Sequence, residues 1–110
     1  MGINFPFGAM ATASISADAS DDAITIDSSV TYITTATLTS NASLELTIDS
    51  EVKAGAMIHI KCTTNGTETF TFGAGIDAPV VTGSAGKTWC QSFVYNGTTF
   101  YPMGAKIQID

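Results

Sequence analysis

The stretch from Ala56 to Phe72 constrains the fold most, because it contains two alternating apolar segments separated by turn-forming residues. In the first segment, Ile58, Ile60 and Cys62 occupy every second position, and this period of two is typical of a half-buried strand. The segment after the turn resumes the same period, with two phenylalanines on one side. The stretch therefore predicts a strand, a turn and a second strand.

The register of these two segments favours a three-residue turn. A two-residue turn at Asn65-Gly66 would place the isoleucines and the phenylalanines on opposite faces, which one-sided burial forbids. A three-residue loop, Thr64-Asn65-Gly66 with a left-handed glycine, instead places Ile60 opposite Phe70. We therefore expect an antiparallel hairpin with its apolar side chains on one face.

The rest of the chain repeats the pattern of short alternating segments between turn residues. Further strands are expected at residues 23–27, 30–39, 44–48, 80–82, 87–103 (a hairpin) and 105–110. One short helical turn ending at Gly55 is the only helix that we consider. The pattern predicts an all-β fold, and we expect an antiparallel, jelly-roll-like β-sandwich, with a small barrel as the alternative.

The hairpin at residues 87–103 has a turn signal of its own. Asn96-Gly97 is typical of a two-residue type I′ turn. Counting outward from that turn pairs Tyr95 with Thr98, and it brings aromatic side chains together on one face.

The chain has the length of one domain, and its first part differs in composition from the remainder. Residues 9–20 consist largely of Ala, Ser, Thr and Asp, and the segment 1–20 cannot bury enough surface to fold alone, so we expect it to be an extended N-terminal arm. The arm is either loose or laid along a neighbouring subunit, with Phe5 and Phe7 as its anchors to a partner. Residues 21–110 then form the β-sandwich domain.

Charge and hydropathy exclude several kinds of partner. Ten carboxylates against four lysines give a formal net charge of -6, which disfavours binding to a nucleic-acid backbone. No apolar run approaches the roughly 20 residues that span a bilayer, and the N-terminus lacks the pattern of a signal peptide. We therefore expect a protein that binds neither nucleic acid nor membrane and is not exported by the general pathway.

Candidate catalytic and metal-binding residues are few. His59 is the only histidine, and no cluster of His, Cys, Asp and Glu at ligand spacing accompanies it. Four aspartates between residues 18 and 27 suit solvated turns better than a calcium site. Cys62 is expected to be a buried free thiol, with a disulfide to Cys90 as the alternative. We predict no catalytic residue, no metal and no cofactor, and hence not an enzyme.

The aromatic residues near the C-terminus allow two interpretations. Trp89, Tyr95 and Tyr101 could form a platform on which a sugar ring stacks, or they could belong to a core or a subunit interface. The first interpretation requires the three rings to be exposed in a row.

The order of these features resembles a small β domain found in virion proteins of tailed bacteriophages. The resemblance rests on an alternating strand at residues 44–48, Ala54-Gly55 leading into Met57-Ile58-His59-Ile60-Lys61, the Thr-rich strand 69–72, and the closing segment 93–101 with its Asn-Gly turn. It covers residues 44–104, and Phe100 stands where that family commonly has Trp.

The resemblance implies a virion structural protein, commonly a homotrimer without an active site, that is made in the host cytoplasm. Because the chain is short for a tail fibre, we expect a capsid-bound decoration or auxiliary protein, or a head fibre, that binds the major capsid protein and self-associates. The alternative is a carbohydrate-binding or receptor-binding module of a tail fibre or surface adhesin, which would use Trp89, Tyr95 and Tyr101.

Overall fold

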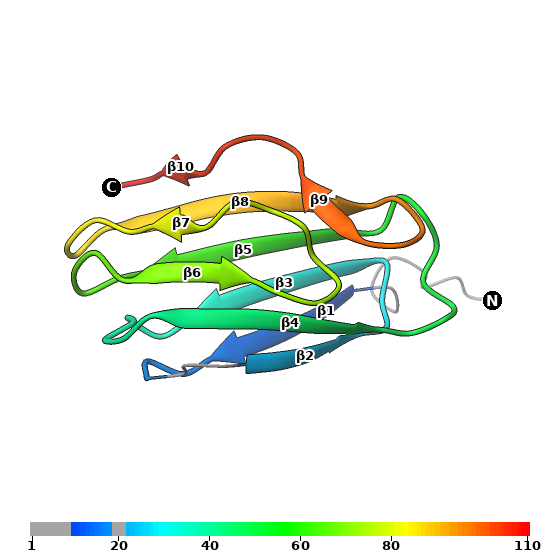
Figure 1. The fold of residues 1–110 in the computed structure, drawn as a ribbon, viewed down its shortest axis with the longest axis horizontal. Coiled ribbons are helices and arrows are strands. Elements are labelled where there is room, and N and C mark those ends of the chain that lie inside the picture. Colours follow the sequence, from blue (N-terminus) through cyan, green and yellow to red (C-terminus); the bar gives the residue numbers. More distant parts are fainter. Residues whose placement is uncertain (1–9, 19–21) are drawn as a thin grey trace.

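The computed structural model describes residues 10–18 and 22–110, and this part of the chain forms two β-sheets packed face to face (Figure 1). Sheet A contains β1 (Met10–Ile15), β3 (Val30–Thr35), β5 (Met57–Thr63), β8 (Thr88–Tyr95), β9 (Phe100–Pro102) and β10 (Ile107–Gln108). Sheet B contains β2 (Asp22–Ile26), β4 (Ala42–Ile48), β6 (Thr69–Phe72) and β7 (Val81–Thr82). The expected all-β sandwich is confirmed.

The strands up to β6 alternate between the two sheets. Strands β1, β3 and β5 pair in parallel in sheet A, and β2, β4 and β6 pair in parallel in sheet B. The chain therefore winds as a flattened coil, whose successive turns are β1–β2, β3–β4 and β5–β6 (Figure 1). Strands β7 and β8 then pair antiparallel with β6 and β5. The expected antiparallel, jelly-roll-like arrangement is therefore wrong for the coil, and antiparallel pairing is found for β7 to β10.

An internal repeat in the sequence matches the coil. The tripeptide Thr-Ile-Asp occurs at residues 25–27 and again at 47–49. The register of β2 and β4 pairs Ile26 with Ile48, and the amide of Asp49 donates a hydrogen bond to the carbonyl of Ile26 at 2.8 Å. Parallel pairing thus places equivalent residues of two successive turns side by side.

The segments around residues 64–68 do not form the expected hairpin. Strand β5 pairs with β3 and β8, whereas β6 pairs with β4 and β7, so the intervening loop carries the chain from sheet A to sheet B. Ile60 lies beside Ile33 and Gln91, and Phe70 lies in the other sheet. Both residues are buried because the apolar faces of the two strands point toward each other across the sandwich.

The second hairpin forms as an antiparallel pair of β8 and β9, with a longer turn than expected. Tyr95 is paired with Phe100, which leaves four residues in the loop instead of two. The side-chain oxygen of Asn96 accepts hydrogen bonds from the amides of Thr98 and Thr99 at 2.8 and 2.9 Å, and these bonds close the longer loop. The expected pairing of Tyr95 with Thr98 is therefore wrong, although the aromatic face is preserved.

Part of the segment that was expected to be an N-terminal arm belongs to sheet A. Residues 10–15 form β1, which pairs along its length with β3 in sheet A. The side chain of Ile15 is only 1% exposed and belongs to the core. The expected arm therefore does not include residues 10–15, because β3 offers β1 a complete strand partner that composition alone does not reveal.

The core fills the space between the two sheets. Its largest buried side chains are Trp89, Phe70, Phe93, Phe100, Ile15, Ile26, Ile33, Leu38, Leu44, Ile58 and Ile60. The segment before Gly55 is a turn without a helix, closed by a hydrogen bond of 3.1 Å from the amide of Val52 to the carbonyl of Asp49. Gly55 has the positive φ of 101° that the sequence suggested.

Candidate functional site

The three aromatic residues considered for sugar stacking do not form a row. Trp89 is 2% exposed and Tyr95 is 9% exposed, whereas Tyr101 is 42% exposed. Trp89 lies edge-on to Phe70 with ring centroids 5.6 Å apart, and Tyr95 stacks on Phe100 at 4.8 Å. The interpretation of Trp89 and Tyr95 as core residues is confirmed, and the exposed platform is wrong. The two expected anchors of the arm, Phe5 and Phe7, lie outside the described residues.

His59 lies on the outward face of β5, and its environment is that of a surface histidine. Its Nδ1 is 2.8 Å from the hydroxyl oxygen of Ser92 on the neighbouring strand. Within residues 10–18 and 22–110, no group of three or more His, Cys, Asp or Glu side chains could hold a metal ion. The described residues therefore provide no group of metal ligands around the His59–Ser92 pair.

The two cysteines are both free. Cys62 is fully buried, as expected, and this burial raises the pKa of its thiol to about 11, with a smaller opposing effect from a hydrogen bond to Thr35. A thiol with such a pKa is almost wholly protonated at neutral pH and is a poor nucleophile. Cys62 is thus a packing residue, and Cys90 lies half-buried on the outward side of β8.

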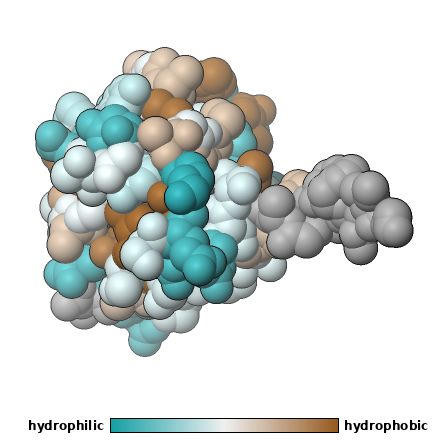
Figure 2. Space-filling view, turned by 90° about the vertical axis from the view of Figure 1, so that its right-hand side faces the viewer, coloured by the Kyte–Doolittle hydropathy of each residue, from teal (hydrophilic) through white to brown (hydrophobic). Residues whose placement is uncertain are grey.

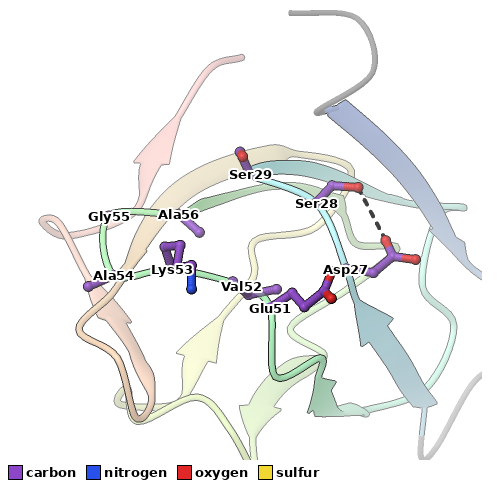
Figure 3. A pocket seen from close by; sticks show the side chains of 9 residues that line it. All are labelled: Asp27, Ser28, Ser29, Glu51, Val52, Lys53, Ala54, Gly55 and Ala56. Atoms are coloured by element: carbon purple, nitrogen blue, oxygen red, sulfur yellow. Dashed lines mark hydrogen bonds between the residues drawn. The ribbon is translucent and has the colours of Figure 1, made fainter. Parts of the chain in front are cut away.

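A pocket of about 370 Å³ lies between the turn after β2 and the loop from β4 to β5 (Figure 3). Its polar side chains include Asp27, Ser28, Glu51 and Lys53, and the hydroxyl of Ser28 donates a hydrogen bond to Asp27 at 3.2 Å. Figure 2 looks onto this end of the molecule and shows hydrophilic and hydrophobic patches interspersed. The polar groups come from turns and are exposed or half-buried, so the pocket lacks the desolvation that activates catalytic groups.

The outward side of sheet A is the most distinctive surface of the described structure. An apolar row crosses five strands in register, from Met10 on β1 through Val30, Met57 and Val94 to Tyr101 on β9. Met10 at one end is 56% exposed, and Tyr101 at the other end is 42% exposed. We call these five residues the apolar row.

A groove lies beside the row at its β1 end. It measures about 710 Å³ and is lined by Met10, Ala11, Thr12, Val30, Tyr32 and His59. Tyr32 stands in it with 41% of its surface exposed. The sequence alone does not reveal this groove, because its walls come from three strands whose pairing was not predicted.

The two sheets differ sharply in the chemistry of their outward faces. The outward face of sheet B carries mainly small polar residues and one carboxylate, namely Ala23, Thr25, Ser43, Glu45, Thr47, Thr69, Thr71 and Thr82. The outward positions of the described strands of sheet A include no carboxylate, although the whole chain has ten. Exposed apolar side chains gathered on one face are a common feature of binding surfaces.

Comparison of the chain with family models, curated proteins and solved structures finds no match. In the described part of the chain, there is no helix long and apolar enough to cross a membrane.

Proposed function

We propose that this chain is a structural subunit of a tailed-bacteriophage virion, which binds the major capsid protein as a decoration, auxiliary or head-fibre protein. The observation that carries the proposal is the contrast between the outward faces of the two sheets. A face that carries an apolar row and no carboxylate in its strands, on an acidic chain, suits attachment to other protein surfaces better than to phosphate. The family resemblance of residues 44–104 is the reason for proposing a phage virion as the larger assembly.

The proposed mechanism is attachment by burial of apolar surface. Met57 and Val94 at the centre of the apolar row are half-buried within the subunit, so a partner that covers the row removes the rest of their surface from water. Each Å² of apolar surface buried in this way contributes roughly 25 cal/mol. Subunits of this kind also associate with one another, and a homotrimer is the assembly that the resemblance implies.

The carbohydrate-binding alternative required exposed rings at residues that are buried. Trp89 and Tyr95 pack in the core, and a single exposed ring at Tyr101 does not provide a stacking row. We therefore do not propose it further.

Mass spectrometry of purified virions tests the proposal. The full chain should be present in a fixed copy number per particle, and it should rebind to particles that lack it. Tyr32→Glu, on the outward face of sheet A, should reduce that occupancy at least tenfold, whereas Thr47→Glu on sheet B should not.

Two results would contradict the proposal in different ways. Absence of the chain from virions would refute the virion role altogether. Normal occupancy of Tyr32→Glu together with loss of occupancy on replacing Phe5 and Phe7 by Ala would assign attachment to the N-terminal segment instead.

A further inference from the structure

We infer that the free edge of β1 binds an extended, basic segment of another protein, which adds a strand to sheet A. The inference concerns the edge of this sheet and goes beyond the proposed function, which uses its outward face. It rests on the open backbone groups of β1, on the protection of the opposite end of the stack, and on the uneven distribution of charge between the two ends.

The backbone of β1 has hydrogen-bonding groups that no described strand satisfies. Within residues 10–18 and 22–110, β1 pairs only with β3 and lies at one end of sheet A (Figure 1). The carbonyl of Ile15 accepts a hydrogen bond at 2.9 Å from the amide of Ala36, which follows β3. Because backbone groups point alternately to the two sides of a strand, the N–H and C=O groups of Thr12 and Ser14 point away from β3. An extended chain is the occupant that matches such a row of donors and acceptors.

The opposite end of the stack is protected against strand addition. Strands β7 and β10 have only two residues each, Pro79 lies two residues before β7, and β9 ends at Pro102. The ammonium group of Lys106 donates a hydrogen bond at 2.9 Å to the carbonyl of Thr82 on β7. Short strands, prolines and lysines are the means by which proteins shield sheet edges. In contrast, β1 has six residues in unbroken register with β3 and contains no Lys, Pro or Gly.

The interior of the sandwich is incompletely covered at the β1 end. Ala13 on β1 and Ile24 on β2 pack against the core but remain half-buried. Their strand partners one winding further in, Ile33 and Leu46, are buried. A strand added to β1 would place its own inward side chains beside Ala13 and cover it. The occupant therefore has apolar side chains at every second position.

The charge distribution selects a basic occupant over a second copy of this chain. Residues 1–52 contain seven carboxylates and no Lys, Arg or His, which gives a formal charge of -7. Residues 53–110 contain three carboxylates and all four lysines, which gives +1. Strands β1 to β4 thus belong to the acidic part, with Asp18 and Asp22 in the connection from β1 to β2 and at its end. Two copies meeting through this end would bring like charges together, whereas a segment with Lys or Arg is attracted to it.

Binding of synthetic peptides to the full chain tests the inference. The probe is a short peptide in which valine alternates with lysine. One control peptide carries glutamate in place of lysine, and another carries proline in place of valine, which keeps the charge but removes backbone donors. Fluorescence anisotropy should show binding of the valine–lysine peptide at least about tenfold tighter than that of either control, and added salt should weaken it.

Hydrogen exchange locates the bound peptide on the sheet. The amides of Thr12 and Ser14 should exchange more slowly in the complex, because they donate to the added strand. The amide of Thr82, on the protected edge strand β7, should be unchanged.

Two substitutions at one position provide a matched pair of variants. Ser14→Pro removes an amide that points away from β3, so it blocks strand addition while keeping the bonds between β1 and β3. It should weaken peptide binding at least about tenfold, whereas Ser14→Ala should not change it. Replacing Asp18 and Asp22 together by Asn should weaken binding about threefold or more, with Asp77→Asn in the other part of the chain as the control.

Several results would overturn the inference. No binding of the valine–lysine peptide, or equal binding of the proline–lysine peptide, would exclude strand addition. So would normal binding by a Ser14→Pro variant whose urea titration shows that it is folded; if this variant does not fold, unchanged exchange of Thr12 and Ser14 in the wild-type complex decides against the inference. Binding that appears only after deletion of residues 1–9 would assign the edge to the chain's own N-terminal segment. None of these results bears on whether the chain occurs in virions, which is measured separately.

Discussion

Phe70 and Trp89 join the two sheets of this protein, with the edge of one ring against the face of the other at a centroid distance of 5.6 Å and an interplanar angle of 89°. Phe70 belongs to β6 in sheet B and Trp89 to β8 in sheet A, and both are almost fully buried. Such a pair contributes about 0.5–1.5 kcal/mol beyond the area that it buries.

Phe70→Ala should therefore destabilise the fold strongly. Removing the ring leaves a cavity between the sheets, and changes of this kind cost about 3–5 kcal/mol, a large part of the stability of a small domain. The free energy of unfolding from urea titration measures the effect. Thr71→Ala, at the neighbouring outward position, should change it by less than about 0.5 kcal/mol. Equal effects of the two substitutions would show that the two sheets do not pack through Phe70.

Gly83 should not tolerate a side chain. A β-carbon at this position would lie 2.5 Å from the Cγ2 atom of Thr64 and 2.8 Å from its Cβ, and Thr64 is itself buried. Gly83→Ala should cost about 1–3 kcal/mol through overpacking. Gly104→Ala, which meets nothing within 4 Å, is the control.

The clash can be verified in a double-mutant cycle. Thr64→Ala removes both the Oγ1 and the Cγ2 atom, which lie closest to the added β-carbon, and its own cost includes the hydrogen bond that Oγ1 donates to the carbonyl of Ser84 at 3.0 Å. The double variant with Gly83→Ala should be more stable than the sum of the two single effects predicts. Strict additivity would count against a direct contact.

Asn96 should contribute to the stability of the β8–β9 hairpin through its side chain. Its side-chain oxygen accepts two amide hydrogen bonds, so Asn96→Ala should cost about 1–2 kcal/mol, and Asn96→Asp should retain most of the stability because a carboxylate also accepts them. Thermal unfolding of the three proteins measures this. A melting temperature of Asn96→Ala equal to that of the wild type would contradict the turn geometry.

Cys62 should make stability decrease at alkaline pH. Burial raises the pKa of its thiol from 9.0 to about 11, so the folded protein retains a proton that the unfolded chain loses. The contribution to stability is complete below about pH 9 and is lost as the pH rises toward 11. The free energy of unfolding should fall more steeply over this range for the wild type than for Cys62→Ala, with Cys90→Ala as the control. Parallel curves for wild type and Cys62→Ala would refute the effect.

Removal of β1 should destabilise the domain. Deleting residues 1–16 removes the buried side chain of Ile15 and exposes the edge of β3, so the loss should be at least about 2–5 kcal/mol. Single-residue Ile15→Ala should reproduce a large part of it. Urea titration of both variants measures the loss. A truncated protein as stable as the full chain would show that β1 does not contribute to the stability of the domain.

The positions of most strands could be predicted from the sequence, but the partners of the first six could not. Alternation reports which side of a strand is buried, and Ile60 and Phe70 are indeed both buried. It does not report whether two such strands lie side by side in one sheet or face each other across two sheets, because both arrangements satisfy one-sided burial. The hairpin prediction failed at this point.

One signal for the correct pairing was present in the sequence. The repeated Thr-Ile-Asp at residues 25–27 and 47–49 marks equivalent places in two turns of the coil. The two copies lie 22 residues apart, which equals the offset between paired residues of β2 and β4, so parallel pairing aligns their equivalent residues along the sheet. The groove beside Met10 could be found only after this pairing, since Met10, Val30 and His59 lie 20 to 49 positions apart in the sequence.

The winding of the first six strands also bears on how such a chain can change in length. Each winding bonds only to the windings next to it, and the reversed strands β7 and β8 close one end of the stack. A whole winding inserted before β5 would find the same neighbours on either side and leave the terminal strands as they are. Proteins built on this plan can therefore grow taller in steps of one winding, while a shorter insertion would have to be accommodated in a loop.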